Sequence, residues 1–172
     1  FQTQPALLTH LQRTEYWARK LRPTADEALY CAALAHDIER SEANSNTNSV
    51  YHRRSFRDPE ALAYHQSRGA VLLKAYLTDK NIAPKAIARV CDLVAHHETG
   101  GTEEQNFIKD ADSLSFLENN LDYFIENLLP THGTEEVIAK FQWMYERISD
   151  PQIKALAHPY YLEAMKKLNP AF

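Results

Sequence analysis

Histidine and aspartate side chains recur in this sequence at positions where the neighbouring residues are small or apolar. The candidates are His10, His36, Asp37, His65, His96, His97 and Asp112. Imidazole nitrogens and carboxylate oxygens, without thiolates, suit a divalent transition metal such as Fe, Mn, Co, Ni or Zn, and Mg less well. Two histidines and two aspartates would leave positions open for water on a six-coordinate metal. The residue types therefore predict a catalytic metal centre rather than a closed structural one.

The dipeptide His36-Asp37 ends the clearest helical pattern in the chain. The residues before it that share one helix face are Ala25, Ala28, Leu29, Ala32 and Ala33. Their spacing predicts a helix that carries His36 inward on its last turn, with Asp37 beside it. An imidazole and a carboxylate in the core need a partner, because an unpaired buried charge is costly.

The remaining candidates lie on helical stripes of their own. Apolar periodicity predicts helices over 5–21, 59–76, 84–98, 106–130, 137–148 and 151–168, and Asp58-Pro59 and Asp150-Pro151 are typical helix starts. Segments with strand-like alternation are absent from the sequence, so the fold class is expected to be all-α. We expect a single domain over 1–172, with a motif-bearing core at about 3–130 and C-terminal helices at 134–169. The polar segment from Glu39 to Asp58 is expected to be a long binding loop.

Composition excludes several function classes. The chain has 172 residues and a net charge of −4, and its basic residues form no block, which argues against a dedicated nucleic-acid surface. An apolar run long enough for a membrane span is also absent from the sequence. Cys31 and Cys91 lie in apolar helical patterns and are interpreted as small buried hydrophobes, which favours a cytoplasmic protein.

The order of the candidates resembles the HD superfamily of metal-dependent phosphohydrolases, whose motif is H…HD…D. The matching residues are His10, Ala35-His36-Asp37 and Ala111-Asp112. The resemblance implies a compact all-α helical bundle in which His10, His36, Asp37 and Asp112 hold one metal. Asp110 is the rival for the last position. Asp112 is preferred because the family places this ligand in Ala-Asp before a hydrophobic residue, and because Asp112 shares a helix face with Ile108.

A dinuclear variant of this superfamily has the order H…HD…H…H…D. His65 fits its third position and the His96-His97 pair fits its fourth. Helical periodicity favours His97, whereas family members with such a pair mostly use the first histidine. We therefore expect His65 and His96 to hold a second metal, with His97 facing the substrate, and the alternative of a one-metal pocket stays open. Asp37 could bridge the two ions.

Basic residues near these motifs are candidates for phosphate binding. Arg40, Arg53 and Arg54 lie on or beside the polar loop, and Lys109 precedes Asp112. The planar guanidinium of arginine matches phosphate oxygens. Asp37 and His97 are the candidate catalytic residues for proton transfer. Glu39 and Glu98 could orient ligand histidines or be ordinary surface acids.

The resemblance implies a phosphohydrolase that cleaves a small-molecule phosphate ester, possibly a nucleotide, with one or two divalent metals per chain. The first alternative is a di-iron oxygenase with the same ligand order, and the second is a non-catalytic metal- or nucleotide-binding module. The segment Glu98-Thr99-Gly100-Gly101-Thr102 lacks the Gly-Tyr-Pro of the cyclic-di-GMP phosphodiesterases, so that substrate is not indicated. The specific substrate and the oligomeric state stay open.

Overall fold

The computed structural model describes residues 5–41 and 55–169, and every regular element within these ranges is helical, as expected. The elements are α1 (Pro5–Leu21), α2 (Glu27–Ala35), the 3₁₀ turn η1 (Ile38–Ser41), α4 (Pro59–Asp79), α5 (Pro84–Ala95), α6 (Glu103–Asn119), α7 (Leu121–Tyr123), the π-helical turn η2 (Phe124–Leu128), α8 (Leu129–His132), α9 (Thr134–Glu146) and α10 (Pro151–Leu168).

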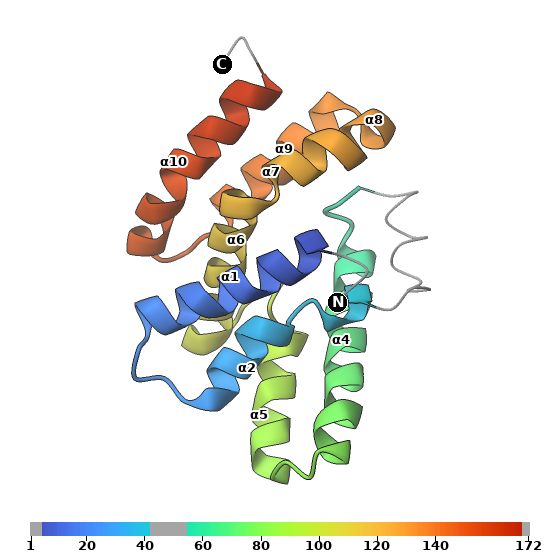
Figure 1. Ribbon diagram of the computed structural model, residues 1–172, viewed down its shortest axis with the longest axis vertical. Coiled ribbons are helices and arrows are strands. Elements are labelled where there is room, and N and C mark those ends of the chain that lie inside the picture. Colours follow the sequence, from blue (N-terminus) through green and yellow to red (C-terminus); the bar gives the residue numbers. More distant parts are fainter. Residues whose placement is uncertain (1–4, 42–54, 170–172) are drawn as a thin grey trace.

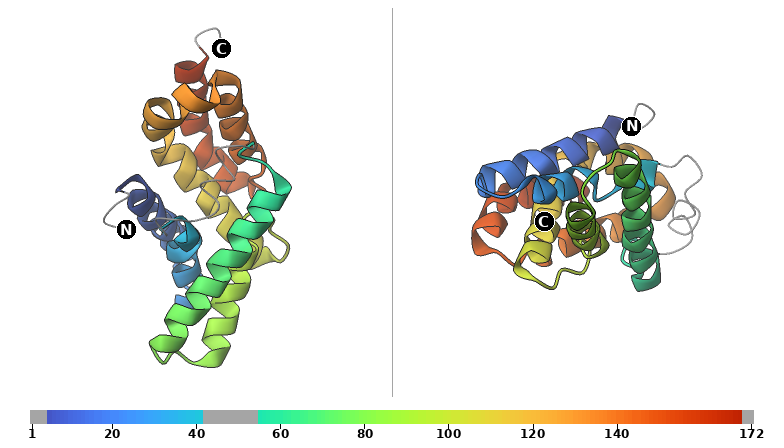
Figure 2. Two further views of the ribbon diagram at one scale, coloured as in Figure 1. Left: turned by 90° about the vertical axis from the view of Figure 1, so that its right-hand side faces the viewer. Right: turned by 90° about the horizontal axis from the view of Figure 1, so that it is seen from below.

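Helix α6 is the central element of the fold. It contacts α1, α2, α5, α9 and α10, while α4 and α5 pack against each other at one end of the molecule. Helices α9 and α10 lie at the opposite end, beside the α7–α8 segment (Figures 1 and 2). Because α6 has neighbours on most sides, polar Asp112, Ser113 and Ser115 are as buried as Ile108 and Leu114. This helix therefore delivers polar groups into the middle of the molecule.

The starts of α4 and α10 agree with the sequence pattern. The side chain of Asp58 accepts hydrogen bonds from the backbone N–H groups of Glu60 and Ala61, and Pro59 occupies the first helical turn. Asp150 caps α10 in the same way. These caps satisfy backbone donors that a helix start leaves without partners.

The prediction of one continuous helix over 106–130 is wrong. Helix α6 begins earlier, at Glu103, where Thr102 and Gln105 form a capping box, and it ends at Asn119. The amide of Asn119 donates to the carbonyl oxygen of Ser115 at 3.0 Å, so side-chain hydrogen bonding accompanies the break. The chain resumes at Leu121 and passes through the π-helical turn, which a pattern of apolar residues does not reveal.

The polar loop expected over 39–58 is described only at its two ends. Its beginning forms the 3₁₀ turn η1, and residues 42–54, with Arg53 and Arg54, lie outside the described residues. Within the described ranges, helices that combine the length and apolar character of a membrane span were not found.

Candidate metal centre

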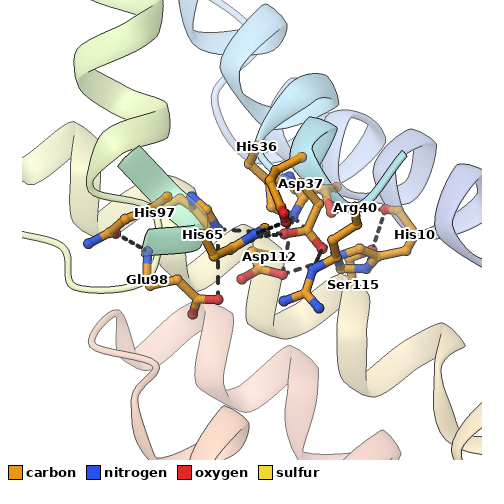
Figure 3. Close-up of polar contacts among 12 residues, drawn as sticks. His10, His36, Asp37, Arg40, His65, His97, Glu98, Asp112 and Ser115 are labelled. Carbon is orange, nitrogen blue, oxygen red and sulfur yellow. Dashed lines mark hydrogen bonds and ion pairs between the residues drawn. The ribbon is translucent and has the colours of Figure 1, made fainter. Parts of the chain in front are cut away.

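Four side chains predicted to hold one metal converge from three parts of the fold. His10 comes from α1, His36 and Asp37 follow α2, and Asp112 comes from α6 (Figure 3). The Nε2 atoms of His10 and His36 are 3.2 Å apart. Asp112 Oδ1 lies 3.1 Å from His10 Nε2 and 3.4 Å from His36 Nε2. The structure therefore brings together the set that the H…HD…D order predicts.

A second group of ligand atoms shares Asp37 with the first. His65 Nε2, from α4, lies 2.7 Å from Asp37 Oδ1, and His97 Nε2, just after α5, lies 3.6 Å from the same oxygen. The His36 and His97 rings stack edge to face with centroids 5.1 Å apart, which brings the two groups side by side. Asp37 thus belongs to both groups of possible ligand atoms.

His97, and not His96, lies in this second group, which corrects the choice made from the sequence. Regular helix α5 ends at Ala95, and His96 leaves helical geometry at φ −126°. The His96 ring then lies beside Asp92 and Gln105, at the outer side of the helix end. His97 follows the inward Val90 and Val94 by seven and three residues, so helical periodicity gave the better prediction.

The histidines present the same ring nitrogen to the cluster. His36 Nδ1 donates to the carbonyl oxygen of Ala33 at 2.9 Å, and His97 Nδ1 donates to that of Val94 at 2.7 Å. Because a carbonyl only accepts, Nδ1 carries a proton in both rings, and Nε2 is the nitrogen that faces the cluster and can bind a metal ion once it is deprotonated.

The other two histidines, His10 and His65, are held through their Nδ1 atoms by polar side chains. Ser115 donates its hydroxyl proton to the carbonyl oxygen of His10 and accepts from His10 Nδ1 at 3.1 Å. His65 Nδ1 lies 2.9 Å from Glu39 Oε2, and Glu39 is buried, so of its two alternatives the orienting role fits and the surface acid does not. Such outer contacts fix ring orientation in metal sites.

The electrostatics of the cluster favour a cation. Burial alone would lower the pKa of His36, but the carboxylates of Asp37 and Asp112 raise it to about 9. Burial would raise the pKa of Asp37, but Arg40 and the neighbouring histidines hold it well below its usual range. Carboxylates that stay charged beside imidazoles attract positive charge into this site.

One observation that is independent of the sequence motif supports a metal ion at this donor set. His97 Nε2 is fully buried and makes no hydrogen bond to any described residue. The ligand atoms of His10, His36 and Asp37 lie within 4.8 Å of one another, as do those of Asp37, His65 and His97. Nitrogen and carboxylate oxygen donors in this arrangement could hold a metal ion in either group.

Asp110, the alternative to Asp112 as a metal ligand, binds a different part of the chain. It is fully buried and accepts hydrogen bonds from the backbone N–H groups of Ser149 and Asp150 and from the Ser149 hydroxyl. It therefore holds the connection between α9 and α10. The Nζ atom of Lys109 lies 3.7 Å from Asp110 Oδ1. Lys109 is not among the residues that line the cavity at the cluster, so the structure does not support its predicted contact with substrate.

Sequence reasoning missed two basic residues on α9. Arg147, which caps the helix, places its guanidinium between the carboxylates of Glu98 and Asp112 and donates to Ser113 Oγ at 2.7 Å. Burial would raise the pKa of Glu98, but Arg147 lowers it to about 2. Lys140 lies seven residues earlier on α9 and is also buried. Both lie at helical spacing from Met144, and that spacing was a signal for their inward position.

A cavity of about 620 Å³ opens onto the first group. His10, Asp37 and Asp112 line it, while His36, His65 and His97 are fully buried behind them. Arg40 also lines the cavity, with its Nε 2.9 Å from Asp37 Oδ2, and its contact with substrate stays a prediction. The cavity lining also includes aromatic residues of α6, α7 and η2, namely Phe116, Tyr123 and Phe124, together with Phe56.

Comparisons with known proteins give one match. No curated protein and no solved structure matches the chain. The model of the family described as "Domain of unknown function (DUF4202)" matches residues 1–168. This match spans almost the whole sequence, and the chain therefore belongs to the DUF4202 family.

Proposed function

We propose that this protein is a metal-dependent phosphohydrolase of the HD type, which cleaves a small-molecule phosphate ester in the cavity at the histidine–aspartate cluster. One observation carries the proposal: Asp37 is shared by two groups of histidines, and it faces a cavity that also contains basic Arg40. The first group joins the residues that resemble the HD motif. The basic side chain favours an anionic substrate over a neutral one.

His10, His36, Asp37 and Asp112 would hold the first metal, and Asp37, His65 and His97 a second. A bound divalent metal supplies Lewis acidity and lowers the pKa of water that it binds. The chain contributes the orientation of each ligand, since the ring nitrogens of His36 and His97 that face away from the cluster are held by backbone carbonyls.

The residues on the cavity wall would bind the substrate and move the proton. The planar guanidinium of Arg40 can bind phosphate oxygens while its Nε stays on Asp37. Asp37 faces the cavity and can accept a proton from the attacking water. His97 does not line the cavity, so we assign it to metal binding in place of the catalytic role expected from the sequence.

The test combines metal analysis with a substrate panel. The protein is purified without chelator, and its metal content and its release of phosphate from p-nitrophenyl phosphate and a panel of phosphate esters are measured. We expect at least one divalent transition metal per chain and phosphate release. The His36→Ala variant should lose both, and His158→Ala, at an exposed histidine on α10, should lose neither.

Other outcomes would contradict the proposal in different ways. A metal-loaded protein that releases no phosphate but consumes O₂ would support the oxygenase alternative. A metal-loaded protein that is inert in both assays would support a binding module. A metal-free wild type with the same melting temperature as His36→Ala would remove the metal centre itself, because metal binding stabilises the folded state.

A further inference from the structure

Lys140 is the one buried lysine among the described residues, and it lines the cavity. It lies on the inward face of α9, three residues after Val137 and four before Met144. Only 7% of its surface is exposed. A lysine on an apolar stripe is unusual, because its charged group is strongly hydrated and costly to bury.

The carboxylates of Glu98 and Asp112 attract the ammonium group of Lys140, but neither forms a hydrogen bond or a close ion pair with it. Hydrogen bonds and ion pairs to Nζ are absent from the described part of the chain, and its neighbours are the rings of Trp143, with the centroid at 4.4 Å, and Phe116, at 5.4 Å. The aromatic faces stabilise the cation in part. They leave its hydrogen-bond donors available to a group in the cavity.

Arg147 explains why the nearby carboxylates do not fill this role. It lies seven residues after Lys140, on the same face of α9, and its guanidinium binds both Glu98 and Asp112. These carboxylates are therefore already neutralised by one cation. Lys140 is a second cation near carboxylates that already have one. Burial lowers the pKa of Lys140 to about 8, which still leaves the group protonated at neutral pH.

We propose that Lys140 forms an oxyanion-binding site in the cavity and that it binds a phosphate oxygen of the substrate. The identity of the oxyanion as phosphate rests on the proposed function, whereas the presence of an anion site rests on the geometry of Lys140. The lysine comes from α9 and Arg40 comes from η1, and both line the cavity, so the two cations would hold an anion between separate elements.

The test measures the binding of inorganic phosphate by calorimetry, with protein in its purified metal state and after chelation, together with metal content and melting temperature. The variants are Lys140→Met and Lys140→Gln, which remove the charge, and Lys140→Arg, which keeps it. Lys166→Met, at an exposed lysine on α10, is the matched control. Acetate replaces phosphate in a parallel arm, which separates phosphate from carboxylate recognition.

We expect both uncharged variants to bind phosphate about tenfold more weakly or worse, the usual loss for a hydrogen bond to a charged group. Lys140→Arg should retain part of the affinity, and the control should retain all of it. Metal content should not change. The melting temperature of Lys140→Met should equal or exceed that of the wild type, because methionine fits the site without a buried charge.

The proposal would be overturned if both uncharged variants bound phosphate as tightly as the wild type. A fall in their melting temperature without a change in phosphate affinity would also overturn it, because that result assigns Lys140 a structural role. Lys140-dependent binding of acetate but not of phosphate would overturn the assignment to phosphate. The proposed function fails separately: a protein that binds phosphate through Lys140 but hydrolyses no ester keeps the anion site and loses the hydrolase.

Discussion

Replacing Arg147 by methionine removes the cation that Glu98 and Asp112 share. The side chains of Arg147, Glu98 and Asp112 are 7%, 4% and 7% exposed, and Glu98 and Asp112 border the cavity, so bulk water screens these charges only weakly. Removing one partner of a buried ion pair costs about 3–5 kcal/mol. The lowered pKa of Glu98 agrees in direction, since burial would raise it and Arg147 is the largest of the charges that lower it. For a chain of this length, the melting temperature should fall by roughly 6–20 °C.

The dependence on pH provides a second readout of the same change. The lowered pKa of Glu98 stabilises the wild type above pH 4.5, and this contribution is lost as the pH falls toward 2. In Arg147→Met the buried carboxyl lacks its cation, so its pKa rises above the usual range and it takes up a proton on mild acidification. The difference in stability between wild type and variant should therefore be larger at pH 7 than at pH 4, because it shrinks first as the pH falls through the raised pKa of the variant and again below pH 4.5.

The assay is urea unfolding of the chelated protein, followed by circular dichroism at pH 7 and pH 4. Arg89 offers a matched control, because it also binds two carboxylates, Asp26 and Glu104, but is 37% exposed. Its replacement by methionine should cost less than about 1 kcal/mol. A double-mutant cycle of Arg147→Met with Glu98→Gln should show coupling. Equal losses for Arg147→Met and Arg89→Met, or no coupling with Glu98, would refute the reasoning.

Three further predictions concern single side chains. His97→Ala should lower the metal content per chain, whereas His96→Ala should leave it unchanged, and equal metal content in the two variants would contradict the second group. Asp110→Asn should lower the melting temperature, because it weakens the acceptor for the Ser149 and Asp150 amides, without loss of metal. Burial would raise the pKa of Glu118, but hydrogen bonds from Arg13, Trp17 and Asn119 lower it. The contribution of Glu118 to the free energy of unfolding is present above pH 4.5 and lost in acid. In Glu118→Gln, the free energy of unfolding should therefore fall less steeply as the pH is lowered below 4.5.

The all-α fold was predictable because most helices have one buried face. Apolar stripes and Asp-Pro starts located α1, α4 and α10 closely. Helix α6 was harder, because a helix with neighbours on most sides has no simple stripe. Its end at Asn119 depends on one side-chain hydrogen bond and on the packing of the next segment, which periodicity does not encode.

The metal-ligand candidates were predictable because a histidine or aspartate on an inward stripe must find a partner. This reasoning placed His36, His65 and Asp112 correctly in the cluster. It placed His96 wrongly because the choice between adjacent histidines depends on the residue at which α5 stops. Lys140 and Arg147 were missed because they follow the motif in sequence and lie beside it only in space.

The π-helical turn at Phe124–Leu128 has a consequence for how related chains diverge. A π turn closes its hydrogen bond over one residue more than an α turn does, so this segment contains the equivalent of a single-residue insertion. Deleting one residue there would restore an ordinary helix and rotate the residues on one side of it by about 100° relative to the other. Tyr123 and His132, which line the cavity before and after the turn, would then be rotated relative to each other. A one-residue gap at this place in a related sequence therefore marks a pocket of different shape.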